Sequence, residues 1–139
     1  KIRFIGVSNF SVDQLMEAQS VTSNPIVNNQ VKYSLSTREI EQDLFPYCMS
    51  NNVTVTAYSP ISPVFGKSSK RLADTLKAIA KDLGKTEAQI ALNWCVSHKN
   101  VIAIPKSSSV ERTIENCSSS GWTLDDKHFA ALNNASAVR

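Results

Sequence analysis

The sequence predicts an α/β protein with four parallel strands and outer helices. Four short apolar runs with a bias toward β-branched residues recur along the chain, and each is followed by a segment with helical capping signals. No low-complexity linker separates these units. Strands that alternate with helices pair in parallel through right-handed crossovers. We therefore expect residues 1–139 to form a single domain.

The first unit contains a strand at 2–7, which is apolar and rich in isoleucine and valine. Ser11 and Gln14 then have the spacing of a capping box, which predicts a helix through about Gln19. This order of strand, polar turn and capped helix is the repeating pattern of the chain.

The second unit contains a strand at 26–31, directly after a proline. Ser36 and Glu39 have capping spacing and predict a helix that runs to about Asn51. Pro46 lies inside this span, so we expect the helix to kink or restart there.

The third and fourth units follow the same rules. They comprise a strand at 53–58, a turn-rich loop at 59–66, a helix at 70–83 closed by Gly84, a helix from Thr86 to about His98, a strand at 101–104, a helix from about Ser109, and a last helix from Thr123 to about Asn134.

Composition excludes several classes of function. The net charge of +3 comes from Lys and Arg residues mixed with acids, and no basic block with interleaved aromatics indicates a nucleic-acid surface. No apolar run approaches the roughly 20 residues that a membrane span needs. The three cysteines lie far apart without metal-ligand spacing, so we expect no metal site and reduced thiols in a cytoplasmic protein. Both histidines, His98 and His128, are expected on helix surfaces.

Polar residues stand at the end of each strand. In parallel sheets the working residues lie at these carboxyl ends, which share one edge. Each residue alone is explained as a helix cap or a turn, whereas the whole set favours a ligand site. The set is Ser8 and Asn9, Gln30, Tyr58 and Ser59, and Lys106 and Ser107.

The segment after the fourth strand predicts a phosphate site. A helix that begins near Ser109 offers free N–H groups and a partial positive charge. Lys106 adds a point charge and Arg112 a planar guanidinium. Glu115 and Asn116 follow on the same helix and have groups that suit an adenine amino group.

The other strand ends suit a nicotinamide. Ser8, Asn9 and Gln30 have the donors and acceptors that a carboxamide needs, and Tyr58 offers a flat ring for stacking. Because no GxGxxG motif is present, a dinucleotide would not be held as in a Rossmann domain.

The ordered set of motifs resembles the second half of the aldo-keto reductase family. The residues that carry the resemblance are Gly6-Val7-Ser8-Asn9-Phe10, Asn29-Gln30-Val31, Ala57-Tyr58-Ser59-Pro60, and Ile104-Pro105-Lys106-Ser107 with Arg112, Glu115 and Asn116. The resemblance implies half of a TIM (β/α)8 barrel, with NADPH as cofactor and an aldehyde or ketone as the substrate of the intact enzyme.

The same resemblance implies a role for each site residue. Ser8, Asn9 and Gln30 would hold the carboxamide, Tyr58 would stack under the nicotinamide, and Ser59 would lie near the pyrophosphate. Lys106, Ser107 and Arg112 would bind the 2′-phosphate, with Glu115 and Asn116 at the adenine.

The family's proton donor is a tyrosine tuned by a lysine, with an aspartate and a histidine beside it, all in the first half of the barrel. Tyr33 and Tyr47 do not match that motif, so we expect no catalytic residue in this chain and no activity from it alone. The alternatives are a non-catalytic module that binds NADP(H), a scaffold protein, and a half-barrel without a ligand.

Length supports the half-barrel interpretation. A TIM barrel takes about 250 residues, and this chain has 139. We therefore expect a fragment of a larger barrel. An open half-barrel exposes two sheet edges and an inner face. They would be covered by the missing half, by a second copy, or by refolding into a flatter sandwich.

Overall fold

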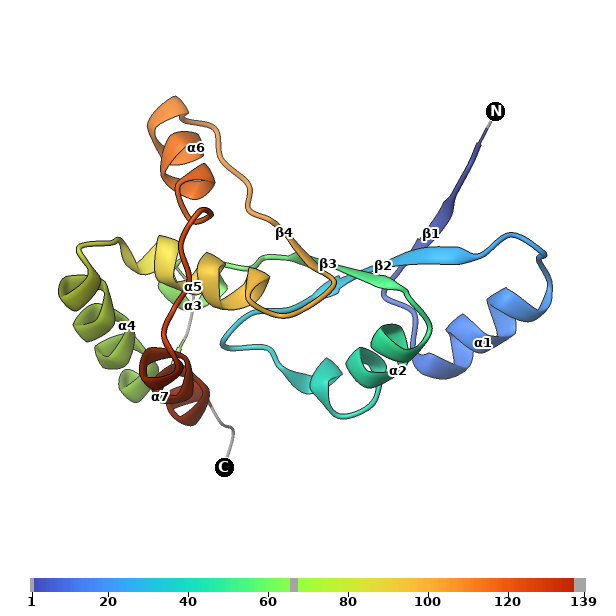
Figure 1. Ribbon diagram of the computed structural model, residues 1–139, viewed down its shortest axis with the longest axis horizontal. Helices are drawn as coiled ribbons and strands as arrows, with labels where there is room; N and C mark the ends of the chain where they lie inside the picture. Colours follow the sequence, from blue (N-terminus) through green and yellow to red (C-terminus); the bar gives the residue numbers. More distant parts are fainter. Residues whose placement is uncertain (1, 66–67, 137–139) are drawn as a thin grey trace.

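Four parallel strands form one sheet in the order β1-β2-β3-β4. The computed structural model describes residues 2–65 and 68–136. The strands are β1 (Ile5–Ser8), β2 (Ile26–Lys32), β3 (Thr54–Tyr58) and β4 (Val101–Ile104). Sequential order and parallel pairing confirm the predicted α/β class (Figure 1).

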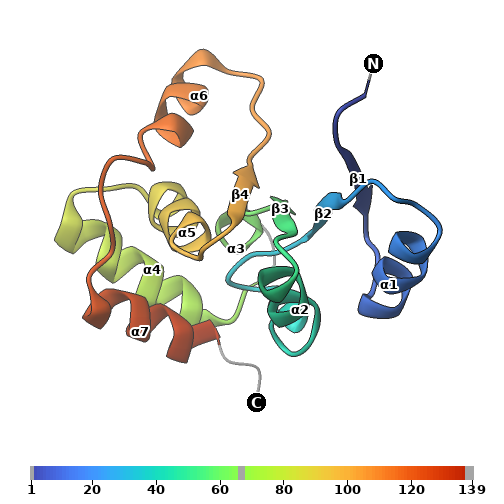
Figure 2. The ribbon, with the colours of Figure 1, turned by 45° about the vertical axis from the view of Figure 1, so that its right-hand side comes forward.

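The helices lie outside the curved sheet. They are α1 (Val12–Ser20), the 3₁₀ helix η1 (Glu39–Glu41), α2 (Leu44–Ser50), α3 (Ser62–Phe65), α4 (Lys70–Leu83), α5 (Glu87–Val96), α6 (Val110–Cys117) and α7 (Asp126–Ser136). Figure 2 shows the concave side, between β1 and α6, free of helices. Helices α4 and α7 pack against each other on the outside.

Strand residues alternate between the two faces of the sheet. Val31, Val55 and Ala57 are buried and pack in the core with Leu76 and Trp94 of the outer helices. The residues between them face the concave side and are only partly covered. This alternation follows from the two-residue period of a strand. The hydrophobic core therefore lies on one face of the sheet and the open, concave side on the other.

The capping residues predicted for α1, α4 and α5 are confirmed. Ser11 and Thr86 each accept a hydrogen bond from the third helical residue, and Gln14 and Gln89 complete two capping boxes. Helix α4 ends at Gly84, whose φ of 59° is a left-handed conformation that glycine adopts at little cost.

The predicted helix at 36–51 is divided into η1 and α2, and its start at Ser36 is wrong. Ser36 caps no helix, because the backbones of Ser34 and Thr37 pair with each other in a turn. The expected restart falls at Leu44 rather than at Pro46: helix α2 begins there, and the Asp43 carboxylate accepts the N–H of Leu44. Pro46 is the third residue of that helix, where its missing N–H costs nothing.

Two predicted boundaries also change. Strand β1 begins at Ile5 rather than residue 2, because pairing with β2 starts at Ile26. Ile2 and Phe4 are 82% and 61% exposed. The predicted loop at 59–66 contains α3, and its residue 66 lies outside the described residues.

Both histidines were wrongly expected on helix surfaces. The His98 ring packs edge-on against Trp94, with 4.7 Å between ring centroids. His128 is 9% exposed, and its Nε2 lies 3.1 Å from the carboxylate of Asp82, so it joins α7 to α4. The His98 ring also lies 5.5 Å from the Phe129 ring of α7, measured between centroids, so both histidines connect separate helices.

Candidate functional site

The concave face carries a row of four side chains at the same level, here called the inner row. Strand register aligns Ser8, Gln30, Thr56 and Ile102. Polar groups on three neighbouring strands therefore face the open side, close to the carboxyl ends of the strands. This is where parallel sheets place ligands.

Contacts between β1 and β2 hold together the residues that are predicted to bind the nicotinamide carboxamide. The Gln30 carbonyl accepts hydrogen bonds from the Ser8 hydroxyl at 3.0 Å and from the Asn9 N–H at 2.8 Å. Among the described residues, the Gln30 side-chain amide has no hydrogen-bond partner. Its donor and acceptor are therefore available to a ligand on the concave face.

Two of the predicted site residues have left-handed backbones. Asn9 has φ 58° and Ser59 has φ 53°, and each directly follows a strand. Residues other than glycine adopt this conformation at some cost in free energy, and such residues cluster at functional sites. Both turns bring polar groups to the sheet edge.

A cavity of about 480 Å³ opens at the ends of β3 and β4. Its lining comprises Tyr58, Ser59, Pro60, Ile61, Ser62, Ile104 and Lys106. Tyr58 is aligned with Ile104 and has its side chain on the concave face. The cavity joins an aromatic ring, a hydroxyl and a cation, as the strand ends predicted.

A second cavity, of about 160 Å³, lies between α6, α5 and the loop that follows β4. It is lined by Ile61, Ala88, Lys106, Arg112, Glu115 and Asn116. Ile61 and Lys106 line both cavities, so the two adjoin. The structure thus gathers Lys106 and the predicted residues of α6 around one hollow.

The amino end of α6 is built by hydroxyl caps. Ser109 accepts a hydrogen bond from the Arg112 N–H at 3.2 Å. The Ser107 hydroxyl donates to the Ser109 carbonyl at 3.0 Å and accepts from its N–H at 3.2 Å. Ser107, unlike Lys106, lines neither cavity, because its hydroxyl closes the turn.

The second cavity carries positive charge. Neither Lys106 nor Arg112 forms an ion pair with any side chain in the described part of the chain. Glu115 is the acidic residue in the lining. A phosphate dianion fits two unpaired cations beside a helix amino end.

The tyrosine after β2 is unsuited to proton donation on the concave face. Tyr33 is fully buried, and its hydroxyl donates to the Glu41 carboxylate at 2.7 Å. Burial, with the neighbouring Glu41 carboxylate, raises the pKa of Tyr33 well above its ordinary range. The carboxylate also binds Arg38, with N–O distances of 2.8 and 2.7 Å. This ion pair is partly exposed and joins residues only three positions apart, and it was not predicted from the sequence.

The cysteines differ in environment. Burial raises the pKa of the Cys48 thiol to about 11 and that of Cys95 to about 12, whereas Cys117 is exposed. Within residues 2–65 and 68–136, no group of three or more His, Cys, Asp or Glu residues could hold a metal ion. No helix of these same residues is long and apolar enough to cross a bilayer.

Comparison with known sequences gives a consistent set of relatives. Methylglyoxal reductase YeaE of Escherichia coli K12 is 34% identical over 137 residues, covering 97% of this chain and 48% of that protein. An uncharacterised oxidoreductase of Mycobacterium tuberculosis is 34% identical over 155 residues, covering 94% of this chain and 48% of the relative. The chain spans about half the length of these curated relatives.

Solved structures show the same relation. The thermostable aldo-keto reductase Tm1743, crystallised with the inhibitor epalrestat, superposes with a TM-score of 0.90 and 41% identity, over 96% of this chain and 48% of that one. An aldo/keto reductase from Klebsiella pneumoniae in complex with NADP and acetate gives 0.87 and 32%, with the same coverage. The fold is thus half of a (β/α)8 barrel. Residues 1–137 match the sequence pattern described as the aldo/keto reductase family, and the chain belongs to that family.

Proposed function

We propose that this chain binds NADPH along the carboxyl edge of its sheet. The nicotinamide end would lie on the inner row, where Ser8 and Gln30, with the adjacent Asn9, would hydrogen-bond the carboxamide. Tyr58 would stack against the ring from the next strand. When bound, NADPH supplies a hydride for a carbonyl carbon.

The adenine end would occupy the second cavity. Lys106 and Arg112 would bind the 2′-phosphate, and Glu115 and Asn116 would contact the adenine. Ser107 contributes by its turn, which holds the amino end of α6 in place. Ser59, in the first cavity, would lie near the pyrophosphate.

The adjoining cavities are the observation that carries this proposal. They connect the aromatic end of β3 with the cationic end of α6 through the shared residues Ile61 and Lys106. A dinucleotide has the same order of groups, from a flat ring through phosphates to adenine. The Klebsiella pneumoniae relatives crystallised with NADP and with NADPH support the same ligand.

We further propose that the chain is the cofactor half of a larger barrel that reduces small aldehydes or ketones. The other half would supply the proton donor and cover the open sheet edges. The tyrosines of this chain would not take that role, because Tyr33 is buried on the helix side, Tyr47 lies on the outer helix α2, and Tyr58 would stack on the ring. The chain alone is therefore expected to bind NADPH without turnover.

Fluorescence titration tests the binding step. NADPH added to the purified chain should show a blue-shifted and enhanced emission that saturates. No change at high micromolar protein would refute the proposed cofactor site.

A reactive aldehyde tests the second step. With bound NADPH, the chain should leave its absorbance at 340 nm unchanged on aldehyde addition, which separates a cofactor half from a complete enzyme. Steady oxidation of NADPH would show that the proton donor lies in this chain and would overturn that part of the proposal.

A further inference from the structure

Asn29 is a polar exception among apolar residues on the helix side of the sheet. It is aligned with Val7 on β1 and with Val55 on β3, and Val55 is aligned with Val101 on β4. Asn29 is 0% exposed. A buried amide costs free energy unless its donor and acceptor are both paired, so its partners show what it does.

Both polar atoms of this amide bind the backbone of one residue. Asn29 Nδ2 donates to the Phe10 carbonyl at 2.9 Å, and Asn29 Oδ1 accepts the Phe10 N–H at 3.4 Å. The side chain thus replaces a strand partner for Phe10 just after β1 ends.

These contacts fix Asn9 from both sides. On one side, the Asn9 N–H and the Ser8 hydroxyl bind the Gln30 carbonyl. On the other side, Phe10 is held by Asn29. Asn9 lies between these anchors with φ 58°, a conformation that a free chain seldom keeps.

We propose that Asn29 is a positioning residue for the nicotinamide end of the site. By holding Phe10, it keeps Asn9 left-handed and its side chain directed to the ligand, although it never contacts the ligand itself. This inference rests on the proposed NADPH site, because Asn9 is assigned there to the carboxamide. The adenine end, around Lys106 and Arg112, is built by other strands and does not depend on it.

Two ligands separate positioning from a general loss of structure. NADPH reaches both ends of the site, whereas adenosine 2′,5′-bisphosphate carries only the adenine end. In Asn29→Ala we expect the Kd for NADPH to rise about tenfold and the Kd for the bisphosphate to stay within about twofold. Equal weakening of both ligands, or unchanged NADPH affinity, would overturn the proposal.

Asn28→Ala is the matched control. Asn28 lies on the same strand, and its amide donates to Thr56 Oγ1 at 2.7 Å on the concave face, away from Phe10. The control removes the same group from the adjacent position and should leave both affinities within about twofold. Asn29→Leu serves if the alanine variant does not fold, because it fills nearly the same volume among apolar neighbours and still removes both hydrogen bonds to Phe10.

Amide hydrogen exchange gives a readout without any ligand. The Phe10 N–H should exchange faster in Asn29→Ala than in the parent or in Asn28→Ala, with core amides of β3 unchanged. An exchange rate of the Phe10 N–H that is the same in Asn29→Ala as in the parent would contradict the inference. Failure of the parent chain to bind NADPH would refute the proposed function instead, so the two results are distinguishable.

Discussion

Lys106 and Arg112 reach the same cavity from different segments, one from the end of β4 and one from the first turn of α6. A charged hydrogen bond to phosphate is worth roughly 1.5–3 kcal/mol. We therefore predict that Arg112→Met weakens NADPH binding by about one to two orders of magnitude and leaves NADH binding nearly unchanged. Paired titrations with the two cofactors measure this.

A control for that experiment is Arg71→Met, which removes an exposed guanidinium from α4. It should change neither affinity. An Arg112 variant that weakens NADH as much as NADPH would contradict the assignment of this cation to the 2′-phosphate.

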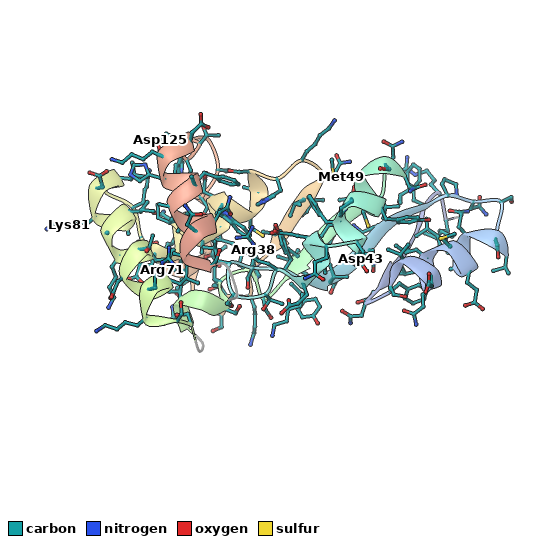
Figure 3. All side chains as sticks on the ribbon, turned by 90° about the horizontal axis from the view of Figure 1, so that it is seen from below. Arg38, Asp43, Met49, Arg71, Lys81 and Asp125 are labelled. Atoms are coloured by element: carbon teal, nitrogen blue, oxygen red, sulfur yellow. The ribbon has the colours of Figure 1, made fainter. Side chains whose placement is uncertain are left out.

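The partly exposed ion pair between Arg38 and Glu41, together with His98, predicts a loss of stability in acid. Arg38 also donates to Ser136 at 2.7 Å and so ties α7 to the loop after β2 (Figure 3). Burial lowers the pKa of His98, although hydrogen bonds to the Trp94 and Cys95 carbonyls oppose the shift. Burial would raise the pKa of Glu41, but hydrogen bonds from Arg38 and Tyr33 hold it below its ordinary value.

Both pKa values are lower in the folded than in the unfolded chain, so the unfolded chain binds more protons in acid. The contribution of His98 is complete above pH 6.5, its ordinary value, and is lost as the pH falls toward its lowered value. The contribution of Glu41 is lost below pH 4.5. Urea unfolding at pH 8, 6.5 and 5 should show stability nearly constant between the first two and lower at the third. In His98→Gln the fall between 6.5 and 5 should shrink, and an unchanged fall would exclude His98 as its source.

At the scale of elements, α6 is the least anchored long helix of the site. It buries none of its residues, and Val110 and Ile114 are 71% and 62% exposed. A hydrogen bond from Gln89 to the Glu115 carbonyl, at 3.2 Å, links it to α5. Local capping therefore determines how well this helix presents Arg112.

We predict that Ser109→Ala destabilises α6 by about 1 kcal/mol, because the N–H of Arg112 loses its acceptor. Amide exchange should speed up along α6 while the melting temperature of the core changes little. Ser118→Ala, at the other end of the helix, is the control. A lower melting temperature without faster exchange in α6 would contradict a local role.

The elements that were predicted well carry their signals locally. Both capping boxes and the glycine end of α4 depend on residues within one helical turn, and the position of the polar residues at the strand ends follows from the order of the strands. The span 36–51 failed because Ser36 has the residue type of a cap but takes part in a turn. The role of Asn29 could not be predicted, because its partner Phe10 lies 19 positions away, in the segment that follows β1.

At the scale of the whole molecule, exposed large apolar side chains of the described residues gather at the two sheet edges. One group lies on α1 and on β1 with the residues that precede it, and comprises Ile2, Phe4, Met16 and Val21. The other lies on β4, on α6 and at the end of α5, and comprises Val96, Ile102, Ile104, Val110 and Ile114. Both edge strands also carry unpaired backbone groups along their free sides.

Such edges predict association of the isolated chain. We expect sedimentation at tens of micromolar to show species larger than the 15.3 kDa monomer. Replacing Ile102 and Ile114 by serine should shift the distribution toward monomer, whereas Lys77→Ser, on exposed α4 surface, should not. A monomer that binds no hydrophobic dye would contradict the exposed edges.

The alternation along β2 has a practical consequence for protein engineering. Positions 28 and 30 address the concave face, whereas 29 and 31 are buried toward the helices. A mutant library restricted to the inner row, to which position 30 belongs, would explore coenzyme preference while sparing the packing that keeps the scaffold intact. Position 29 is the exception. Although its side chain is buried on the helix side, changing it would also alter ligand selectivity, because it holds Phe10 beside the site.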